Sequence, residues 1–483
     1  MASLYEYSSL GFMNPFYLEK QEGIVVGDFK SLALLSSRVL DTTSVVQILN
    51  KSHTLGDRTL IEGVKMTPWN AYLSHDKNKW EYNKYLPRHG YELTTPEVAA
   101  DKLYEKLEKE LATQLVGKKK IGILLSGGMD SRVVAAIVNN ILSGSNVEVV
   151  GLTWGLVHSR DVVYAQRICK DFEWEFRHFK LDADMLRENI DIAAEAGAIY
   201  SPVHLHAMPS ISKQTDLDII LAGSFGDSVG RAEYSGTSLV NLKSLNYTPR
   251  SKFNLIKRTI IEEAKSNIAN DIKLYRELFP RDEEYQHCEI EKQAHYMRKQ
   301  LNQCMAFIND RIPLYQAFTS VEVYGYIWGL DPTIRTDEIY YKLLTKYSPS
   351  LLDIPWARTG TKYFTSNSES SPLDELSKDH HDYGTWIRHD LYEDIKNLVL
   401  SDAIDKIGIF NMSSLKELIS LNKGIKGKMT MVDEYLIWIA CLAKFIERYN
   451  ISNNKKSPKK IIGVFDVVFT KSEFYAFKIK NKI

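Results

Sequence analysis

The sequence lacks paired cysteines, a signal-peptide pattern and long apolar runs, and each absence excludes a class of protein. Its four cysteines stand at positions 169, 288, 304 and 441, without a Cys-x-x-Cys pair or a His/Cys cluster. This spacing argues against a structural zinc site and is typical of a reducing compartment, so we expect a cytoplasmic protein. The N-terminus has no basic segment followed by an apolar run, so we expect no signal peptide. No stretch of about 18 apolar residues occurs, and we therefore expect no membrane helix and no membrane partner.

A surplus of either charge is also lacking. Lys and Arg total 61 residues and Asp and Glu total 61, so nothing in the overall charge indicates a nucleic-acid partner. A length of 483 residues is enough for a large core and two or more domains. The sequence leaves the oligomeric state open, with a homodimer as one alternative.

The strongest positive feature is the stretch from Ile121 to Arg132. An apolar run that includes Leu124 predicts a buried strand, and a helical pattern with Val134, Ile137 and Val138 on one face follows. The turn between them consists of small or polar residues: Ser126, Gly127, Gly128, Asp130 and Ser131. A strand, a small-residue turn and a helix N-terminus together favour phosphate binding, because turn amides and the helix dipole both attract anions.

This loop differs from a Walker loop because it lacks the Gly-Lys-Ser/Thr ending. Asp130 would repel phosphate, so its position makes sense if it holds a cation such as Mg²⁺ that bridges to the phosphates. We therefore predict ATP and Mg²⁺ as cofactors. The alternative interpretation is an ordinary glycine-rich turn.

Strands and helices alternate between residues 121 and 222, with strands expected at 121–125, 147–154, 176–181 and 217–222. This pattern predicts an α/β fold with a doubly wound parallel sheet, in which ligands bind at the carboxyl ends of the strands. Before it, Thr95-Pro96-Glu97 should open an amphipathic helix that carries Leu103 and Leu107. After it, residues 251–449 should form a large helical part.

The region before the sheet is mixed, with short strands expected at 23–29 and 31–39 and a helix at 43–49. At the other end, residues 451–460 read as a basic linker, and the alternation of apolar and polar residues over 461–479 predicts a hairpin. The expected domains are an N-terminal region 1–95, a main domain 96–450 and a C-terminal extension 451–483.

Several motifs together resemble a known family. Ser126-Gly-Gly-Met-Asp-Ser131 resembles the pyrophosphate-loop motif of the ATP pyrophosphatases, and the wider pattern from about Val39 to Tyr449 is similar to the synthetase domain of the asparagine synthetase family. The other matching segments are Leu55–Val64, Gly223-Ser-Phe-Gly-Asp227, Arg311-Ile-Pro313 and Ile354-Pro-Trp-Ala-Arg358. On this resemblance, residues 1–95 would be a degenerate remnant of the family's glutaminase domain, and the sheet would be of the ATP-pyrophosphatase type.

The resemblance also implies roles for single residues. Asp130 and Asp227 would hold Mg²⁺ on the pyrophosphate, and Arg358 and Lys362 would neutralise the α-phosphate. The residues that would contact the nucleotide are Leu124, Ser126, Gly127, Gly128, Asp130, Ser131, Thr153, Trp154, Gly223 and Ser224, with Ser159 as a further candidate for the adenine pocket. The alternatives are a turn aspartate at 227, two solvated bases at 358 and 362, and a core tryptophan at 154.

Two departures from the family limit what the resemblance implies. The family's glutaminases need an N-terminal cysteine nucleophile, whereas this sequence begins Met-Ala-Ser, so we expect no intrinsic glutaminase. Ser224 stands where amide-forming members carry Glu and β-lactam synthetases carry Tyr, and serine alone is a poor base. His204 and His206 are the nearest replacement bases, with Asp310 a weaker one; the alternative is that both histidines are structural.

The sequence therefore predicts an ATP-dependent, AMP-forming carbon–nitrogen ligase that activates a carboxylate and passes it to an amine. Three hypotheses stay open. The amine is part of a substrate, as in the β-lactam synthetases and lasso-peptide cyclases that the chain resembles in lacking the cysteine. It is ammonia, either free or supplied by a partner. Or the protein binds nucleotide without turnover. We favour the first.

Overall fold

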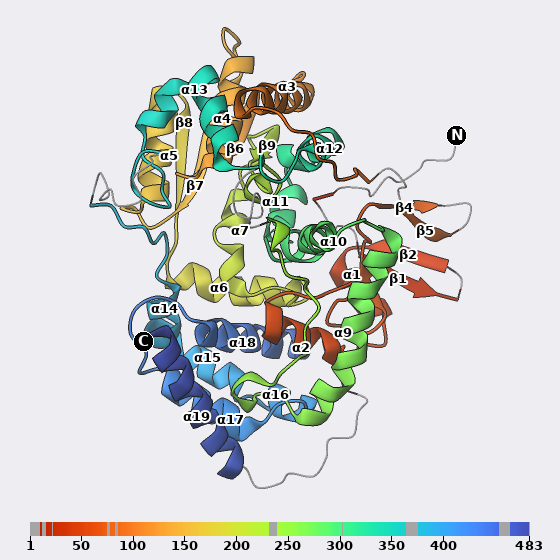
Figure 1. The fold of residues 1–483 in the computed structure, drawn as a ribbon. Helices are drawn as coiled ribbons and strands as arrows, with labels where there is room; N and C mark the ends of the chain where they lie inside the picture. Colours follow the sequence, from red (N-terminus) through yellow and green to blue (C-terminus); the bar gives the residue numbers. More distant parts are fainter. Residues whose placement is uncertain are drawn as a thin grey trace.

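A computed structural model describes residues 10–11, 16–21, 23–74, 78–82, 86–230, 239–301, 303–363, 375–453 and 464–482. Five parallel strands form its central sheet in the order β10-β9-β6-β7-β8 (Figure 1). Their bounds are β6 Lys120–Leu124, β7 Glu148–Gly155, β8 Glu175–Lys180, β9 Ile219–Ala222 and β10 Leu314–Gln316. The predicted α/β class with a parallel sheet is confirmed.

Alternate residues of each strand enter two separate cores. Ile121 and Ile123 of β6 belong to a core with α3 (Pro96–Leu115), α4 (Met129–Ile141), α5 (Arg160–Asp171), α12 (Val321–Gly329) and α13 (Asp337–Tyr347). Leu124 belongs to the opposite core with α6 (Ala183–Glu195) and α7 (Met208–Ile211). Side chains of a strand point to opposite faces in turn, so helices cover both sides of the sheet, as a doubly wound fold requires.

Local signals in the sequence explain where these helices begin. The Thr95 side chain accepts a hydrogen bond from the Val98 amide and Pro96 occupies the first turn, so α3 begins where the sequence predicts. Leu103 and Leu107 are fully buried on its inner face. In α4, Val134 and Ile137 are likewise buried, which confirms the predicted packing face.

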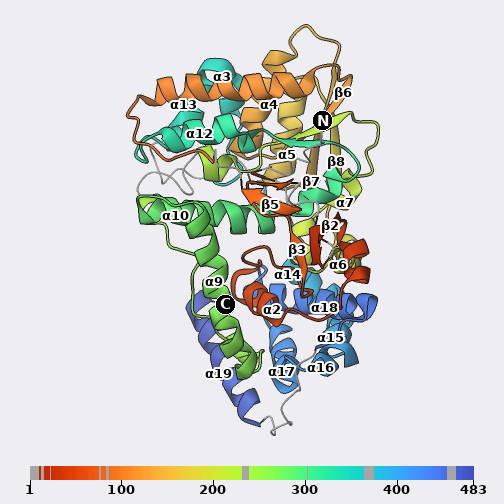
Figure 2. The ribbon, with the colours of Figure 1, turned by 90° about the vertical axis from the view of Figure 1, so that its right-hand side faces the viewer.

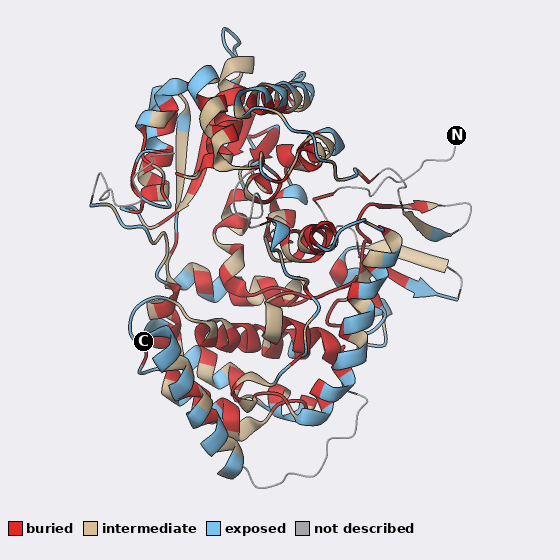
Figure 3. Cartoon of the chain, in the orientation of Figure 1, coloured by how far each residue is buried: buried red, intermediate tan, exposed pale blue. Residues whose placement is uncertain are grey.

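A helical body lies below the sheet in Figures 1 and 2. Its helices are α9 Arg258–Leu278, α10 Glu284–Glu291, α14 Tyr383–Thr385, α15 Tyr392–Val399, α16 Asp402–Ile407, α17 Met412–Asn422, α18 Met431–Tyr449 and α19 Val464–Asn481, with α11 Ala306–Asn309 closer to the sheet. α18 is buried along most of its length, between α6 and α15 (Figure 3). We refer to α15–α19 as the helical bundle.

The N-terminal region combines small sheets and helices. β1 (Phe16–Lys20), β2 (Gly23–Gly27) and β3 (Val64–Met66) form an antiparallel sheet in the order β2-β1-β3, and β4 (Ala71–Ser74) pairs with β5 (Lys79–Tyr82). α2 (Thr42–Lys51) confirms the helix predicted at 43–49. The strand predicted at 31–39 is wrong: α1 (Phe29–Leu35) occupies this segment, because Asp28 caps the Ser31 amide and starts a helix.

The hairpin predicted over 461–479 is also wrong, because Val464–Asn481 forms the single helix α19. Apolar residues are frequent enough here to fit both an alternating and a helical period. The helical form buries Thr470 and Phe474 against α17 and the turn at Phe253, whereas an isolated hairpin would have been marginal in stability. The division of the chain into three domains stays a prediction.

Candidate functional site

Three backbone amides of the loop between β6 and α4 donate to side chains of the loop or of α5. The Ser126 amide donates to Ser131 Oγ over 3.2 Å, and the Gly128 amide donates to Ser126 Oγ over 3.1 Å. The Gly127 amide donates to Asp161 Oδ1 over 3.1 Å. We expected these amides to be directed at a phosphate, but each is engaged within the chain. In this arrangement, a phosphate at the loop would have to displace one of these acceptors or use other donors.

Asp161 is a site residue that the sequence did not reveal. It lies in the first turn of α5, and its carboxylate accepts the Gly127 amide. Burial raises the pKa of Asp161, while the neighbouring His380 imidazole and the Gly127 hydrogen bond act in the opposite direction. The sequence gives only a helix start at this position, so nothing local linked it to a loop 34 residues earlier.

Arg132 fixes a distant segment to this loop. Its buried guanidinium donates to the carbonyls of Leu351 (2.9 Å), Ile354 (2.7 Å), Pro355 (3.0 Å) and Gly127 (3.1 Å). Burial lowers the pKa of Arg132 to about 10, so the group stays charged near neutral pH.

The close contact between the loop and the 351–357 segment requires a glycine. A Cβ on Gly127 would lie 2.7 Å from Ala357 Cβ and 2.9 Å from the Tyr164 ring. The Ala357 amide also donates to the Gly127 carbonyl over 3.1 Å. The loop and the segment that carries Arg358 therefore form one packed unit.

The second motif, Gly223–Asp227, follows β9 and closes on the first turn of α4. A Cβ on Gly223 would lie 2.6 Å from the Asp130 carbonyl carbon, and one on Gly226 would lie 2.7 Å from Asp130 Cβ. Only glycine allows this approach. Because β6 and β9 are neighbours in the sheet, their carboxyl ends bring Asp130 and Asp227 to the lining of the same cavity.

That cavity has a volume of about 270 Å³. Seven of the predicted residues line it: Asp130, Trp154, His204, His206, Gly223, Ser224 and Asp227. The sequence did not predict the other lining residues, which are mainly apolar or sulfur-containing: Met208, Phe225, Met297, Gln300, Cys304 and Met305. Several flexible methionines in one wall suit a pocket that adapts its shape to a ligand.

The remaining predicted residues lie outside this lining. Leu124 and Thr153 are buried in their strands, while Ser126, Gly127, Gly128 and Ser131 form the loop described above. Arg358 is exposed with its guanidinium 5.5 Å from the centre of the Trp356 ring. Lys362 is exposed and pairs with Asp353 over 3.2 Å. The roles of these two bases stay predictions.

The two histidines occupy different environments. His204 Nε2 lies 3.2 Å from Glu434 Oε1, at the start of α18. His206 Nδ1 lies 2.8 Å from the Tyr383 hydroxyl. Burial lowers the pKa of His206 well below its ordinary value, and the nearby imidazoles of His380, His204 and His381 lower it further. His206 is therefore neutral near pH 7, whereas His204 has a carboxylate partner.

The Ser224 hydroxyl donates to Met305 Sδ over 3.1 Å and pairs with no acid among the residues that the structure describes. Sequence reasoning also missed Glu434, Tyr383 and the adjacent histidines at 380 and 381. Glu434 lies 230 positions after His204, so no motif spacing could have linked them. The adjacent histidines at 380 and 381 were the one local pattern in the sequence that could have pointed to any of these residues.

Asp130 and Asp227 suit a cation that a ligand helps to hold. Among the residues that the structure describes, no group of three or more His, Cys, Asp or Glu side chains could bind a metal ion. Mg²⁺ characteristically takes one or two protein carboxylates and completes its coordination with water and substrate phosphates. The two aspartates therefore fit Mg²⁺ bound together with a nucleotide.

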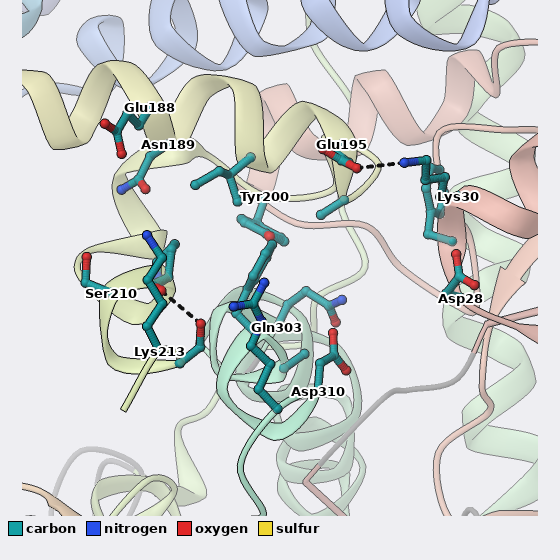
Figure 4. Close-up of a pocket in the computed structure, with 18 of the residues that line it drawn as sticks. Asp28, Lys30, Glu188, Asn189, Glu195, Tyr200, Ser210, Lys213, Gln303 and Asp310 are labelled. Carbon is teal, nitrogen blue, oxygen red and sulfur yellow. Dashed lines mark hydrogen bonds and ion pairs between the residues drawn. The ribbon is translucent and has the colours of Figure 1, made fainter. Parts of the chain in front are cut away.

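Figure 4 shows a second and larger cavity, of about 590 Å³. It is bounded by α6, α7, α11 and the start of α1, and Lys30 pairs with Glu195 at 3.1 Å along its rim. The Tyr200 side chain is buried in its wall, and its hydroxyl has no hydrogen-bond partner among the described residues. The segment 303–306 separates the two cavities: Cys304 and Met305 line the first, and Gln303 and Ala306 line the second.

No described helix combines the length and the hydropathy that a membrane crossing requires.

Comparison with known proteins agrees with the predicted resemblance over part of the chain. Residues 102–312 match the family model described as asparagine synthase. A protein of Methanocaldococcus jannaschii that carries the provisional name glutamine-hydrolysing asparagine synthetase 1 is 25% identical over 157 residues. The match covers 31% of this chain and 27% of that protein, so it spans about a quarter of the relative's length.

Among solved structures, the U34-tRNA thiolase NcsA of Methanococcus maripaludis is 13% identical, with a TM-score of 0.24 over 49% of this chain and 96% of the thiolase. A TM-score this low supports no inference. The family match includes both cavity aspartates, both histidines and Ser224. Residues 102–312, somewhat less than half of the chain, are therefore similar to the asparagine synthase family.

Proposed function

We propose that this protein activates a substrate carboxylate with ATP, releases pyrophosphate, and transfers the acyl group from the resulting acyl-adenylate to an amine. The observation that carries the proposal is the convergence of Asp130 and Asp227 on one cavity at the carboxyl ends of two adjacent strands. Two carboxylates so placed would repel each other unless a cation joined them. Mg²⁺ bound with the nucleotide by these aspartates would neutralise the charge of the leaving pyrophosphate.

The chain's own residues would position the reacting groups. The substrate carboxylate must lie in line with the bond to the leaving pyrophosphate, so the rigid β6–α4 loop, fixed by Arg132, would define the attack direction. Arg132 also adds a buried positive charge near the Gly127 carbonyl, which favours a bound anion. Arg358 and Lys362 would contribute at the α-phosphate only after leaving their present partners, Trp356 and Asp353, because neither lines the cavity.

His204 is the proposed base that takes the proton from the attacking amine. In the tautomer with hydrogen on Nε2, that N–H donates a hydrogen bond to Glu434 Oε1, which leaves the lone pair on Nδ1 to take the proton. Ser224, at the family's position for an acid, is engaged with a thioether and offers no comparable group. His206 is the alternative base, but its lowered pKa makes it the weaker proton acceptor.

The amine is proposed to belong to a substrate. All four cysteines are buried, and burial raises the pKa of Cys169, Cys288 and Cys304 to about 12 and that of Cys441 further, so none of them resembles a reactive thiolate. A thiol-dependent ammonia source within these residues is therefore disfavoured. The cavity of about 590 Å³ next to the site offers room for a second substrate. Partner-supplied ammonia is the competing source.

The first experiment measures exchange of labelled pyrophosphate into ATP with a panel of carboxylic acids. We expect acid-dependent exchange, and a loss of about a hundredfold or more in Asp130→Asn and Asp227→Asn with the melting temperature unchanged. Asp171→Asn, at the exposed end of α5, is the matched control. Binding of ATP without exchange for any acid would favour a nucleotide-binding protein without turnover, and full exchange in both variants would overturn the metal assignment.

The second experiment separates the two half-reactions. His204→Asn and Glu434→Gln should retain pyrophosphate exchange while amide formation falls about a hundredfold. His206→Asn should have the smaller effect. If His206→Asn alone abolishes amide formation, the base assignment is wrong while adenylation stands. Stimulation by ammonium in place of an organic amine would favour the ammonia-dependent alternative.

A further inference from the structure

The outward face of α19 carries an apolar stripe that no described part of the chain covers. Phe465 is 87% exposed, Ile479 81% and Val468 61%, and Phe469 and Tyr475 are more than half exposed. Their successive spacings of three, one, six and four residues place them within about a third of the circumference of a helix of 3.6 residues per turn. Water-exposed side chains of this size in a contiguous row mark an interaction surface.

The opposite face of α19 is firmly attached to the protein. Thr470 Oγ1 donates to the Phe253 carbonyl over 3.0 Å, and the Phe253 amide donates to Glu473. The Asn254 side chain donates to Asp466 Oδ1 over 2.7 Å, and Phe474 is buried. The stripe is therefore the outer surface of a docked helix, with both helix acids engaged by the body.

Lysines outnumber acids beside the stripe, and both acids of α19, Asp466 and Glu473, accept hydrogen bonds from the body. Lys471, Lys478 and Lys480 belong to α19 and Lys482 follows it; Lys480 lies on the other side of the stripe from Lys471 and Lys478. Lys471 also contacts Glu417 at 3.4 Å. Lysines on both sides of an apolar stripe match an anionic occupant and would repel a second copy of the same face.

We propose that α19 binds an anionic lipid surface, lying in the interface plane with its apolar stripe inserted and its lysines at the headgroups. An amphipathic helix with aromatic residues on one side and lysines at its edges is suited to this position. In Figures 1 and 2, α19 lies on the outside of the helical bundle, at the far end of the molecule from the sheet. Docking there leaves the candidate site accessible. Because this surface is remote from the cavity, the inference does not depend on the proposed activity.

The test is co-sedimentation of the full chain with vesicles of phosphatidylcholine alone or with phosphatidylserine at about one lipid in three. We expect binding to the anionic vesicles alone, weakened by high salt. Phe465→Ser with Phe469→Ser should reduce binding at least about tenfold, and each of Lys478→Gln and Lys480→Gln should reduce it about fivefold. Leu93→Ser, which replaces an exposed leucine outside α19, is the control.

Circular dichroism of each variant checks that α19 and the fold persist. Absence of binding to anionic vesicles, or equal binding to neutral ones, would overturn the proposal. A dimer in lipid-free solution that the paired Phe variants dissociate would instead identify a second copy as the occupant. A binding loss of the same size in Leu93→Ser would show that the stripe has no special role.

Discussion

Two almost completely buried arginines, one beside the sheet and one just before α15 at the helical bundle, are satisfied in opposite ways. Arg132 binds four backbone carbonyls and no carboxylate. Arg388 forms an ion pair with Asp433 and adds the carbonyls of Gly427 (2.9 Å) and Lys428 (2.7 Å). The bundle thus pairs its buried cation directly with a carboxylate, whereas Arg132 binds backbone carbonyls and interacts with the buried Asp161 carboxylate at longer range. That difference suits a loop whose geometry Arg132 fixes through the main chain and a bundle that serves mainly as support.

The largest expected loss of stability comes from breaking the ion pair between Arg388 and Asp433. Arg388→Leu leaves the Asp433 carboxylate buried without its cation, so we expect a loss of about 3–5 kcal/mol in the free energy of unfolding. Urea denaturation monitored by circular dichroism measures it. The double variant Arg388→Leu with Asp433→Leu should recover most of the loss, because no buried charge remains. A double variant less stable than the single one would contradict this account of the pair.

Removing the Arg132 guanidinium should reduce stability less than removing that of Arg388, but it should reduce activity more. Arg132→Met deprives carbonyls of their donor but breaks no direct ion pair, so we expect a loss of about 2–3 kcal/mol in unfolding free energy. Pyrophosphate exchange should fall about tenfold or more, because the loop loses both its fixation and its charge. Arg132→Lys keeps the charge but loses the planar guanidinium geometry, so its rate of pyrophosphate exchange should lie between those of wild type and Arg132→Met. Unchanged exchange in a folded Arg132→Met protein would show that this charge is irrelevant to the site.

The smallest effect concerns a third buried cation, Lys299. Its ammonium group donates to the Gly56 carbonyl and lies 3.4 Å from Thr54 Oγ1. Burial lowers the pKa of Lys299 from 10.5 to about 7, although Asp57 acts in the opposite direction. Between about pH 7 and 10.5 the unfolded chain therefore binds more protons at this residue than the folded one, so its contribution to stability rises with pH.

We expect wild type to gain about 1 kcal/mol from pH 7 to pH 8 relative to Lys299→Met, in matched urea titrations. The comparison with the variant removes the contributions of other titrating groups. Parallel pH profiles for the two proteins would mean that Lys299 does not titrate in this range.

What the sequence predicts well is local. The strand, loop and helix from Lys120 to Ile141 follow from hydrophobic period and turn chemistry, and the start of α3 follows from Thr95 and Pro96. The convergence of Asp130 and Asp227 follows from the rule for parallel sheets. These features need no knowledge of distant contacts.

What it misses depends on partners far along the chain. The Gly127 amide is taken by Asp161, and His204 is oriented by Glu434, and neither pair leaves a pattern in the sequence. α19 was misread because its apolar residues fit two periods, and only packing against α17 and Phe253 selects the helix. Whether Arg358 and Lys362 reach a nucleotide is likewise a question of side-chain direction.

The first turn of α18 joins two parts of the molecule through neighbouring acids. Asp433 holds Arg388 in the bundle, and Glu434 holds His204 at the cavity. Successive helix residues point about 100° apart, so a single turn of α18 can contact Arg388 through one side chain and His204 through the next. Heat that loosens the bundle therefore also releases His204 from its partner. In the other direction, a substrate that immobilises His204 should raise the melting temperature of a bundle that it never touches.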